Sequence, residues 1–393
     1  MRATYPGKPW IPAALSLLLV GPTGCPTSIS DDDDSTAAGD DDADPVVDCE
    51  TLWEVPGGGG TFYEQNPTYE DPVDDSDDWT FSAPGDQGMD GARLDQAAGQ
   101  LETLPYFWSF LVLRNGIIVA EHYFNGAEAN HSNNVHSSSK SLLGVLTGVA
   151  IEEGHITGIE QPVSELLPGH FAAIDDPAKA SITVGHLLTM TAGFDWTEDS
   201  TEYQIENQPD WVQAILDLPL AETPGEVFNY STGQTHVLGA ALAEATGMST
   251  CQYAHQALLG PLGNVAEHWG RDPQGYFSGG CNVYMTPREL ARLGLLVGDG
   301  GQWRGAQLVP ADWVDAAVSA QTDAGYGYSY GYLFWLTTIR GHAVAIAWGW
   351  GGQLVYVVRD LDLVVVFTTN TRDFAPDYDG FDILRDHVIP AVE

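Results

Sequence analysis

Strand-forming segments lie near both ends of the apolar part of this chain, and helical patterns fill the region between them. Residues 110–114 and 117–124 are rich in β-branched and aromatic side chains, and Asn115-Gly116 between them favours a tight type I′ hairpin. Similar runs follow in the C-terminal third, at residues 326–336, 343–348, 354–358 and 363–368. We therefore predict an α+β domain whose N- and C-terminal segments form one antiparallel sheet, flanked by helices and carrying an all-helical insertion.

The helices are predicted from the spacing of apolar residues. Between residues 142 and 149 these follow the i, i+3, i+4, i+7 pattern of an amphipathic helix, which we expect to begin near Ser137 and to end before Gly154. Further helices are expected at residues 183–190, 236–244, 286–296, 310–318 and 381–388.

Acidic residues are concentrated near the N-terminus. The 393-residue chain has a formal net charge of -41, and residues 26–92 contain 20 Asp or Glu and no Lys or Arg. Such a segment buries too little apolar surface to offset its ordering entropy, so we expect residues 26–78 to be a disordered acidic linker before a domain at residues 79–393. Its Asp runs lack the spacing of a calcium loop. The negative charge also excludes nucleic acid as a partner, because phosphate binding needs a basic surface.

Residues 1–25 have the order of an export signal. Basic residues precede an apolar run from Trp10 to Val20, and small residues lead to Cys25. The run is too short for a membrane-spanning helix. The sequence Pro22-Thr23-Gly24-Cys25 resembles a bacterial lipoprotein signal, in which the Cys is lipidated, although Leu is usual in place of Pro22. We expect an exported protein, periplasmic or extracellular, that is either secreted or held to a membrane through lipid on Cys25.

Three cysteines follow Cys25, and none has the spacing of a metal site. Cys49, Cys251 and Cys281 allow at most one internal disulfide, and the sequence leaves the pairing open. The histidines are scattered and form no HExxH pattern, so a metal site is not expected.

Ser137 and Lys140 are the first candidates for chemistry. Residues three apart on a helix share a face, so the hydroxyl and the amine can meet. A serine needs a neighbouring base to take its proton, and a lysine can serve once desolvation or nearby positive charge lowers its pKa. The chain has only three lysines, and Lys140 alone has a serine three positions earlier. This scarcity favours a functional pair over two surface residues.

Two further segments can complete such a site. Tyr230 precedes a helix and can relay the serine proton to the leaving group if a nearby ammonium favours its phenolate; simple packing is the alternative. Trp350-Gly351-Gly352 precedes Gln353 at the start of a strand, where glycines admit a substrate and strand N–H groups can bind an oxyanion. A β-bulge without chemistry is the alternative here. No GxSxG elbow supports an α/β-hydrolase.

In this order, the three segments resemble the penicillin-recognising serine hydrolases. The branch includes class C β-lactamases, D-alanyl-D-alanine carboxypeptidases, family VIII esterases and 6-aminohexanoate-dimer hydrolases. Similar stretches include ITVGHLLTMTAGF at residues 182–194 and YMTPRELARLG at residues 284–294. The resemblance implies a β-lactamase/transpeptidase-like fold and a mechanism without metal or organic cofactor. It also implies that Ser137 is acylated, that Lys140 and Tyr230 share proton transfer, and that the backbone N–H groups of Ser137 and Gln353 bind the oxyanion.

Two departures from the family pattern change the expected substrate. Thr232 stands where β-lactamases and peptidases of this branch commonly have Asn, which removes an amide contact to the substrate. Trp350 stands in place of the Lys of Lys-Thr-Gly, which removes a cation for a substrate carboxylate. The Trp-Gly-Gly triplet is similar to family VIII esterases, and the residues around it to 6-aminohexanoate-dimer hydrolases.

We therefore expect a serine hydrolase that acts on a small ester or amide. The alternatives are β-lactam or D-Ala-D-Ala hydrolysis on the same fold, and a non-catalytic sensor or binding protein. The oligomeric state is left open by the sequence.

Overall fold

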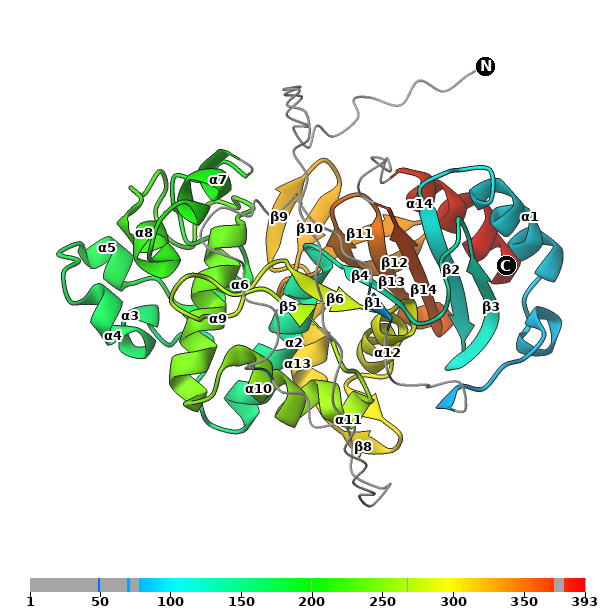
Figure 1. The fold of residues 1–393 in the computed structure, drawn as a ribbon, viewed down its shortest axis with the longest axis horizontal. Coiled ribbons are helices and arrows are strands. Elements are labelled where there is room, and N and C mark those ends of the chain that lie inside the picture. The colour runs from blue at the N-terminus through cyan, green and yellow to red at the C-terminus, as the bar shows by residue number, and fades with distance from the viewer. Residues whose placement is uncertain are drawn as a thin grey trace, which may run out of the picture. The chain divides into compact units, whose positions relative to one another are not determined.

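An eight-stranded antiparallel sheet brings the two ends of the domain together (Figure 1). Its strand order is β3-β2-β14-β13-β12-β11-β10-β9, so the N-terminal hairpin pairs with the C-terminal strands through β2 and β14. This arrangement confirms the predicted α+β class. The strands are β2 (Phe107–Arg114), β3 (Ile117–Tyr123), β9 (Thr322–Gly325), β10 (Tyr328–Tyr330), β11 (Trp335–Ile339), β12 (His342–Gly349), β13 (Gln353–Val358) and β14 (Leu363–Thr369).

The computed structural model describes residues 49, 69–70, 78–198, 200–266, 268–370 and 378–392. The expected export signal with Cys25 and most of the expected linker therefore lie outside the described residues. Within the described part of the chain, no helix combines the length and the apolar character needed to span a membrane.

The structure confirms one turn that the sequence predicts in the sheet and contains a second turn that the sequence pattern does not predict. Asn115 and Gly116 have φ angles of 53° and 75°, as the expected type I′ turn between β2 and β3 requires. Residues 326–336, predicted as one strand, instead contain β10 and part of β11, which pair with each other. Gly331 stands at this turn, where a Cβ would lie 1.9 Å from the backbone oxygen of Ala317. The single-strand prediction was wrong because a packing contact, rather than a polar turn, interrupts the run.

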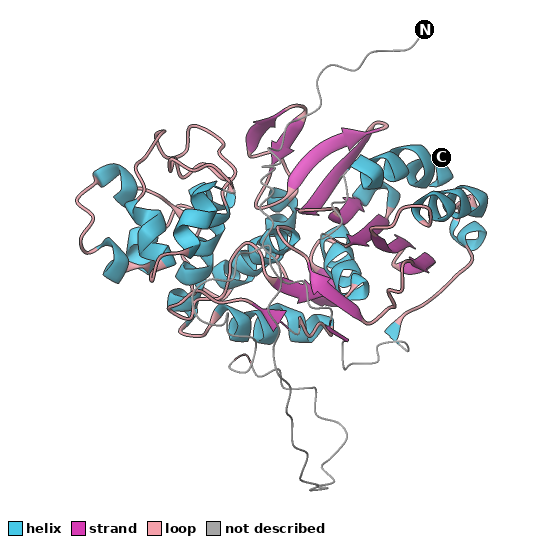
Figure 2. Cartoon of the chain, turned by 45° about the horizontal axis from the view of Figure 1, so that its top comes forward, coloured by secondary structure: helices cyan, strands magenta, loops and turns pink. Residues whose placement is uncertain are grey.

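Helices cover both faces of the sheet (Figure 2). Along β14, Val365 and Phe367 belong to one apolar core, and Val364 and Val366 belong to the other. All residues of β13 and β14 are buried, which explains their continuous apolar sequence. The first core includes α1 (Gly91–Leu101), α14 (Tyr378–Ile383) and α15 (Ile389–Val392), and the second includes α2 (Ser138–Glu152), α12 (Pro287–Gly298) and α13 (Ala311–Ala317).

The predicted helical insertion follows α2. Its helices are α3 (Val163–Leu166), α4 (Pro168–Phe171), α5 (Pro177–Ala180), α6 (Val184–Leu188), α7 (Ser200–Glu206), α8 (Trp211–Asp217), α9 (Thr232–Thr246), α10 (Thr250–Ala254) and α11 (Gly260–Leu262). The helix expected from residue 236 begins earlier, at Thr232, because the Ser231 side chain caps it by accepting the backbone N–H of Gln234. This start places Tyr230 and Thr232 at the N-terminal end of α9.

Short strands form two smaller sheets. One has the order β1-β4-β6-β5, and the other pairs β7 with β8. The strands are β1 (Tyr69–Glu70), β4 (His131–Asn134), β5 (His268–Trp269), β6 (Val283–Met285), β7 (Gln302–Trp303) and β8 (Ala306–Gln307). Because β1 lies in the expected linker and pairs with β4, this part of the segment is joined to the domain.

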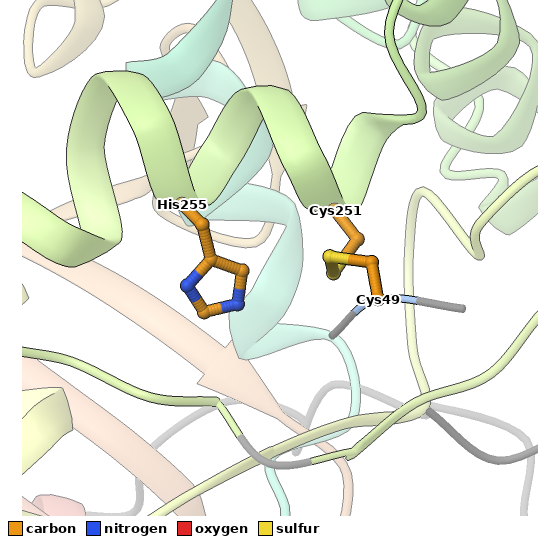
Figure 3. Close-up of side chains that lie close together, drawn as sticks. All are labelled: Cys49, Cys251 and His255. Carbon is orange, nitrogen blue, oxygen red and sulfur yellow. A yellow bond between two sulfur atoms is a disulfide. The ribbon is translucent and has the colours of Figure 1, made fainter. Parts of the chain in front are cut away.

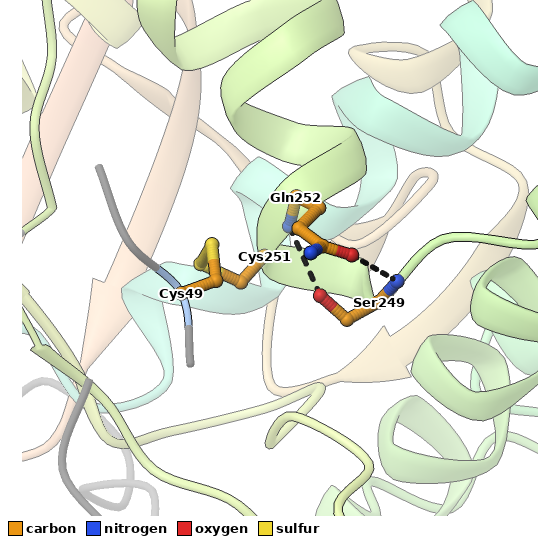
Figure 4. Close-up of a disulfide and its surroundings, with 4 residues drawn as sticks. All are labelled: Cys49, Ser249, Cys251 and Gln252. Atoms are coloured by element: carbon orange, nitrogen blue, oxygen red, sulfur yellow. Dashed lines mark hydrogen bonds between the residues drawn. A yellow bond between two sulfur atoms is a disulfide. The ribbon is translucent and has the colours of Figure 1, made fainter. Parts of the chain in front are cut away.

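A disulfide makes a second connection between the expected linker and the domain. Cys49 is bonded to Cys251 of α10, 202 residues later, and both are buried (Figure 3). Ser249 and Gln252 form a capping box around the start of α10 (Figure 4). Cys281 is a buried free thiol. Of the pairings that the sequence leaves open, the structure contains Cys49–Cys251.

Replacing Cys49 with serine is expected to lower the free energy of unfolding by about 2–4 kcal/mol, because the disulfide closes a long loop in the unfolded chain. Chemical denaturation without reductant measures this difference. Cys281→Ser keeps the disulfide and serves as the matched control, and reduction should bring the wild-type protein to the stability of Cys49→Ser. Equal stability of the unreduced wild-type and Cys49→Ser proteins would contradict the expectation.

Candidate active site

Ser137 and Lys140 meet at the N-terminal end of α2. Lys140 Nζ lies 2.9 Å from Ser137 Oγ, within hydrogen-bond distance. Ser137 is the N-cap residue, but within the described chain its hydroxyl makes no capping hydrogen bond, which leaves it available to the lysine. The helix N-terminus adds a field that favours negative charge on the serine oxygen. The structure thus brings the two residues together as the three-residue spacing predicts.

The Lys140 amine is buried among oxygen atoms. Besides Ser137 Oγ, Nζ lies 2.9 Å from Thr232 Oγ1 and 2.8 Å from the backbone oxygen of Gly280. Only 1% of the lysine is exposed. Burial lowers the pKa of Lys140, and the negative charge of Glu198 offsets part of this shift. A lysine with a lowered pKa can act as a base toward a serine hydroxyl.

Tyr230 lies beside both residues, just before α9. Lys140 Nζ is 5.1 Å from the centre of its ring. Burial raises the pKa of Tyr230 well above its usual value, and the charge of Glu198 raises it further. The phenolate expected from the sequence is therefore disfavoured, because burial and the charge of Glu198 both favour the neutral phenol. Tyr230 keeps its proton and can donate it.

Trp350-Gly351-Gly352 forms the turn between β12 and β13. Its two glycines have φ angles of 76° and 100°, a conformation that favours glycine. Gln353 follows as the first residue of β13 and is fully buried. Ser138 Oγ donates to the Gln353 backbone oxygen at 2.6 Å, which ties the start of α2 to the start of β13. This bond holds the strand backbone against the residue that follows Ser137, where an oxyanion site is expected.

Glu198, which the sequence pattern does not single out, joins this arrangement. Its Oε1 accepts a hydrogen bond from the Thr232 hydroxyl. Its Oε2 accepts the Thr232 backbone N–H at 3.0 Å and Trp196 Nε1 at 2.5 Å. Thr232 therefore contacts Glu198 on one side and Lys140 on the other. Glu198 lies in a loop 34 residues before Thr232, so no local spacing signals the contact.

Aromatic side chains lie next to Tyr230 and along the β12–β13 turn. Trp335 stacks on Tyr230 with 5.4 Å between ring centres and contacts Trp348 at 5.6 Å. The rings of His136 and Trp350 are 5.7 Å apart. Burial lowers the pKa of His136 to about 4, so this ring is neutral at neutral pH. The surroundings of the serine thus combine apolar surface with a small number of polar groups.

Within the described residues, one set of side chains of the kinds that bind metals lies close together: Cys49, Cys251 and His255 (Figure 3). The two sulfur atoms are bonded to each other, so neither is a thiolate that could bind a metal. The expectation that the protein needs no cofactor stays a prediction.

The family of this chain follows from comparison with known proteins. The family model described as Beta-lactamase matches residues 108–387. The chain belongs to the beta-lactamase family. A 6-aminohexanoate-dimer hydrolase from Paenarthrobacter ureafaciens is 28% identical over 238 residues, which cover 56% of this chain and 60% of that relative. The match thus spans less than two thirds of the relative's length.

Solved structures confirm the β-lactamase/transpeptidase-like fold. EstCE1, described as a hydrolase with promiscuous acyltransferase activity, has a TM-score of 0.63 at 17% identity and covers 76% of this chain and 98% of its own. D-alanine carboxypeptidase AmpC from Burkholderia cenocepacia has a TM-score of 0.59 at 14% identity and covers 77% of this chain and 99% of its own. The chain therefore has the fold of these proteins.

Proposed function

We propose that this beta-lactamase family protein is a serine hydrolase that cleaves a small ester or amide through an acyl-Ser137 intermediate. The observation that carries the proposal is the 2.9 Å contact between Ser137 Oγ and the buried amine of Lys140. Burial lowers the pKa of Lys140, as a base that works near neutral pH requires.

In the proposed reaction, Lys140 accepts the Ser137 proton as Oγ attacks the acyl carbon. Backbone N–H groups of Ser137 and Gln353 stabilise the oxyanion. Tyr230 then donates its phenolic proton to the leaving alcohol or amine, and the Lys140 ammonium restores the proton to Tyr230. Water hydrolyses the acyl-serine with the same groups acting in reverse.

The surroundings of Ser137 favour an ester or a simple amide over a β-lactam. The Thr232 hydroxyl is engaged by Lys140 and Glu198, and it replaces the side-chain amide of the β-lactamases. Trp350 offers no charge to a substrate carboxylate, and Trp335 adds apolar surface next to Tyr230. Similarity to a 6-aminohexanoate-dimer hydrolase keeps a linear amide within the proposed substrate range.

We also propose that the protein works outside the cytoplasm. The expected export signal at residues 1–25 supports this location, and the Cys49–Cys251 disulfide fits an oxidising compartment. Lipid attachment at Cys25 remains part of this proposal.

Covalent labelling tests the proposed function. A fluorophosphonate should add once to the folded protein, at Ser137, as located by intact-mass and peptide analysis, and should not label Ser137→Ala. Turnover of p-nitrophenyl butyrate should exceed that of nitrocefin. Faster nitrocefin hydrolysis would identify a β-lactamase instead. Absence of both labelling and turnover would favour a non-catalytic binding protein.

A further inference from the structure

Lys140 must lose a proton before it can act as a base, and the structure contains a path for that proton. Lys140 Nζ lies 2.9 Å from Thr232 Oγ1, and the same hydroxyl donates to the Glu198 carboxylate. We infer that Glu198, acting through the Thr232 hydroxyl, takes the resting proton of Lys140 and so prepares the amine for Ser137. This inference rests on the proposed serine hydrolase function.

The hydrogen bonds around Lys140 suit both protonation states of its amine. The Gly280 backbone oxygen can only accept, and Thr232 also accepts from Lys140 because its own proton is directed at Glu198. Ser137 Oγ, the third partner, accepts from an ammonium but donates to a neutral amine. The lysine can therefore change its charge without any movement of its heavy-atom partners.

The proton transfer involves only three side chains, and every proton that leaves one of them is taken up by another. One N–H bond of Lys140 breaks as its proton moves to Thr232 Oγ1, while the original hydroxyl proton of Thr232 moves to a Glu198 oxygen. Lys140 changes from ammonium to amine and Glu198 from carboxylate to carboxylic acid, while Thr232 remains a hydroxyl that now donates toward Lys140 and accepts from Glu198. Rotation of the Thr232 O–H and about the Cε–Nζ bond of Lys140 then turns the lone pair of the amine toward Ser137.

The exposure of these residues gives the path a direction. Lys140 is 1% exposed and Thr232 5%, whereas Glu198 is only partly buried and reaches solvent. Glu198 is therefore the end of the path that can exchange protons with water. Asn229 Nδ2 donates to the backbone oxygen of Trp196 at 3.0 Å, so the segment carrying Thr232 also positions the loop of Glu198. Glu198 acts on Ser137 only through other side chains and is a positioning residue.

A capping role for Glu198 must be separated from proton transfer, because its carboxylate also accepts the backbone N–H of Thr232 at the start of α9. Glu198→Gln keeps an oxygen for this N–H but cannot accept the proton. Thr232→Val removes the hydroxyl at similar volume, and Thr232→Ser restores it. Glu202→Gln removes another negative charge that acts on Lys140 and is the control for charge alone.

The test compares the pH at which activity is lost with the pH at which Lys140 titrates. The rate of p-nitrophenyl butyrate hydrolysis, measured between about pH 5 and pH 9, gives the pH at which activity is lost. NMR of ¹³Cε-labelled lysine gives the pH at which Lys140 titrates, and among the signals of the three lysines of the chain, the one that Lys140→Met removes belongs to Lys140.

The wild-type protein should stay active below the pH midpoint of Lys140 titration, because the proton can move within the pair. In Glu198→Gln and Thr232→Val, activity should instead fall together with Lys140 protonation, with a loss of about 10- to 100-fold near pH 6. The double variant should lose no more than the worse single variant. Thr232→Ser and Glu202→Gln should keep the separation between activity and lysine titration.

Most other titratable groups around the amine keep their charge in this pH range. Burial lowers the pKa of His136 to about 4. Burial also raises the pKa values of Tyr230, Tyr330 and Cys281 well above their usual ranges. Glu202 is present in every compared protein except Glu202→Gln, so its titration affects the pH profiles of the others equally.

Three results would overturn the inference: wild-type activity that tracks Lys140 titration, an unchanged pH profile in Glu198→Gln, or losses that multiply in the double variant. The NMR measurement does not depend on turnover. If the wild-type protein neither hydrolyses the ester nor reacts with fluorophosphonate, the proposed function fails. A Lys140 midpoint that falls further in Glu198→Gln than in the charge control Glu202→Gln would still support the coupling, and an unchanged midpoint would overturn it.

Discussion

Ser137→Ala is expected to reduce ester turnover by about 1,000-fold or more, because the acyl-enzyme cannot form without its hydroxyl. The loss should appear in kcat at saturating substrate, since the aromatic surface around Tyr230 and Trp335 is unchanged. Turnover of p-nitrophenyl butyrate by the purified wild-type and variant proteins measures the effect.

The neighbouring serine provides the matched control. Ser139 Oγ donates to the backbone oxygen of His136 at 2.8 Å, so Ser139→Ala removes one buried hydrogen bond of α2 at a cost of about 1 kcal/mol. It should keep most of its turnover, and cooperative thermal unfolding of both variants would show that both are folded. Retention of wild-type turnover by Ser137→Ala would place the nucleophile elsewhere.

The fold could be predicted where its signals are local. The Asn115-Gly116 hairpin and the β-branched runs of β12, β13 and β14 depend on residues next to each other in the sequence. The strand predicted over residues 326–336 was wrong because Gly331 turns the chain against Ala317, which a local pattern does not reveal. The Cys49–Cys251 bond likewise joins segments that no spacing relates.

The same distinction applies to the candidate active site. Ser137 and Lys140 are one helical turn apart, so their contact follows from the helix itself. Tyr230 and Gln353 were candidates from their own segments, the family resemblance implied their roles, and the structure places both next to the start of α2. The sequence could show that these segments belong together, but not their distances.

Three contributions to the site were missed because they connect distant segments. Glu198 bonds to Thr232 across 34 residues, Lys140 to the Gly280 backbone across 140, and Ser138 to the Gln353 backbone across 215. Gly280 also carries a steric requirement, since a Cβ there would lie 3.0 Å from Lys140 Nζ. A backbone oxygen and a glycine leave no side-chain pattern, so they emerge only when the fold is known.

Replacing Lys140 should have the second large effect on turnover. Lys140→Met removes the amine from a buried position but keeps an unbranched side chain, and kcat/KM at neutral pH should fall by about 100- to 10,000-fold. Lys140→Arg should be similarly inactive, because a guanidinium keeps the positive charge but does not release its proton in proteins. Wild-type turnover by Lys140→Arg would show that charge alone suffices and that Lys140 is not the base.

The stability of Lys140→Met should also differ from wild type in its dependence on pH. Burial lowers the pKa of Lys140 in the folded protein below the usual 10.5, which applies to the unfolded chain. Between these two values the unfolded state binds the extra proton, so the wild-type protein gains stability relative to Lys140→Met as pH rises through the window. Below the window both states hold the proton, and the buried ammonium destabilises the fold fully. Tyr230 and Cys281 are present in both proteins, so their titration cancels from the comparison. Urea denaturation near pH 6 and pH 9 measures the difference; parallel pH dependence in the two proteins would mean that the folded lysine keeps its usual pKa and cannot serve as the base for Ser137.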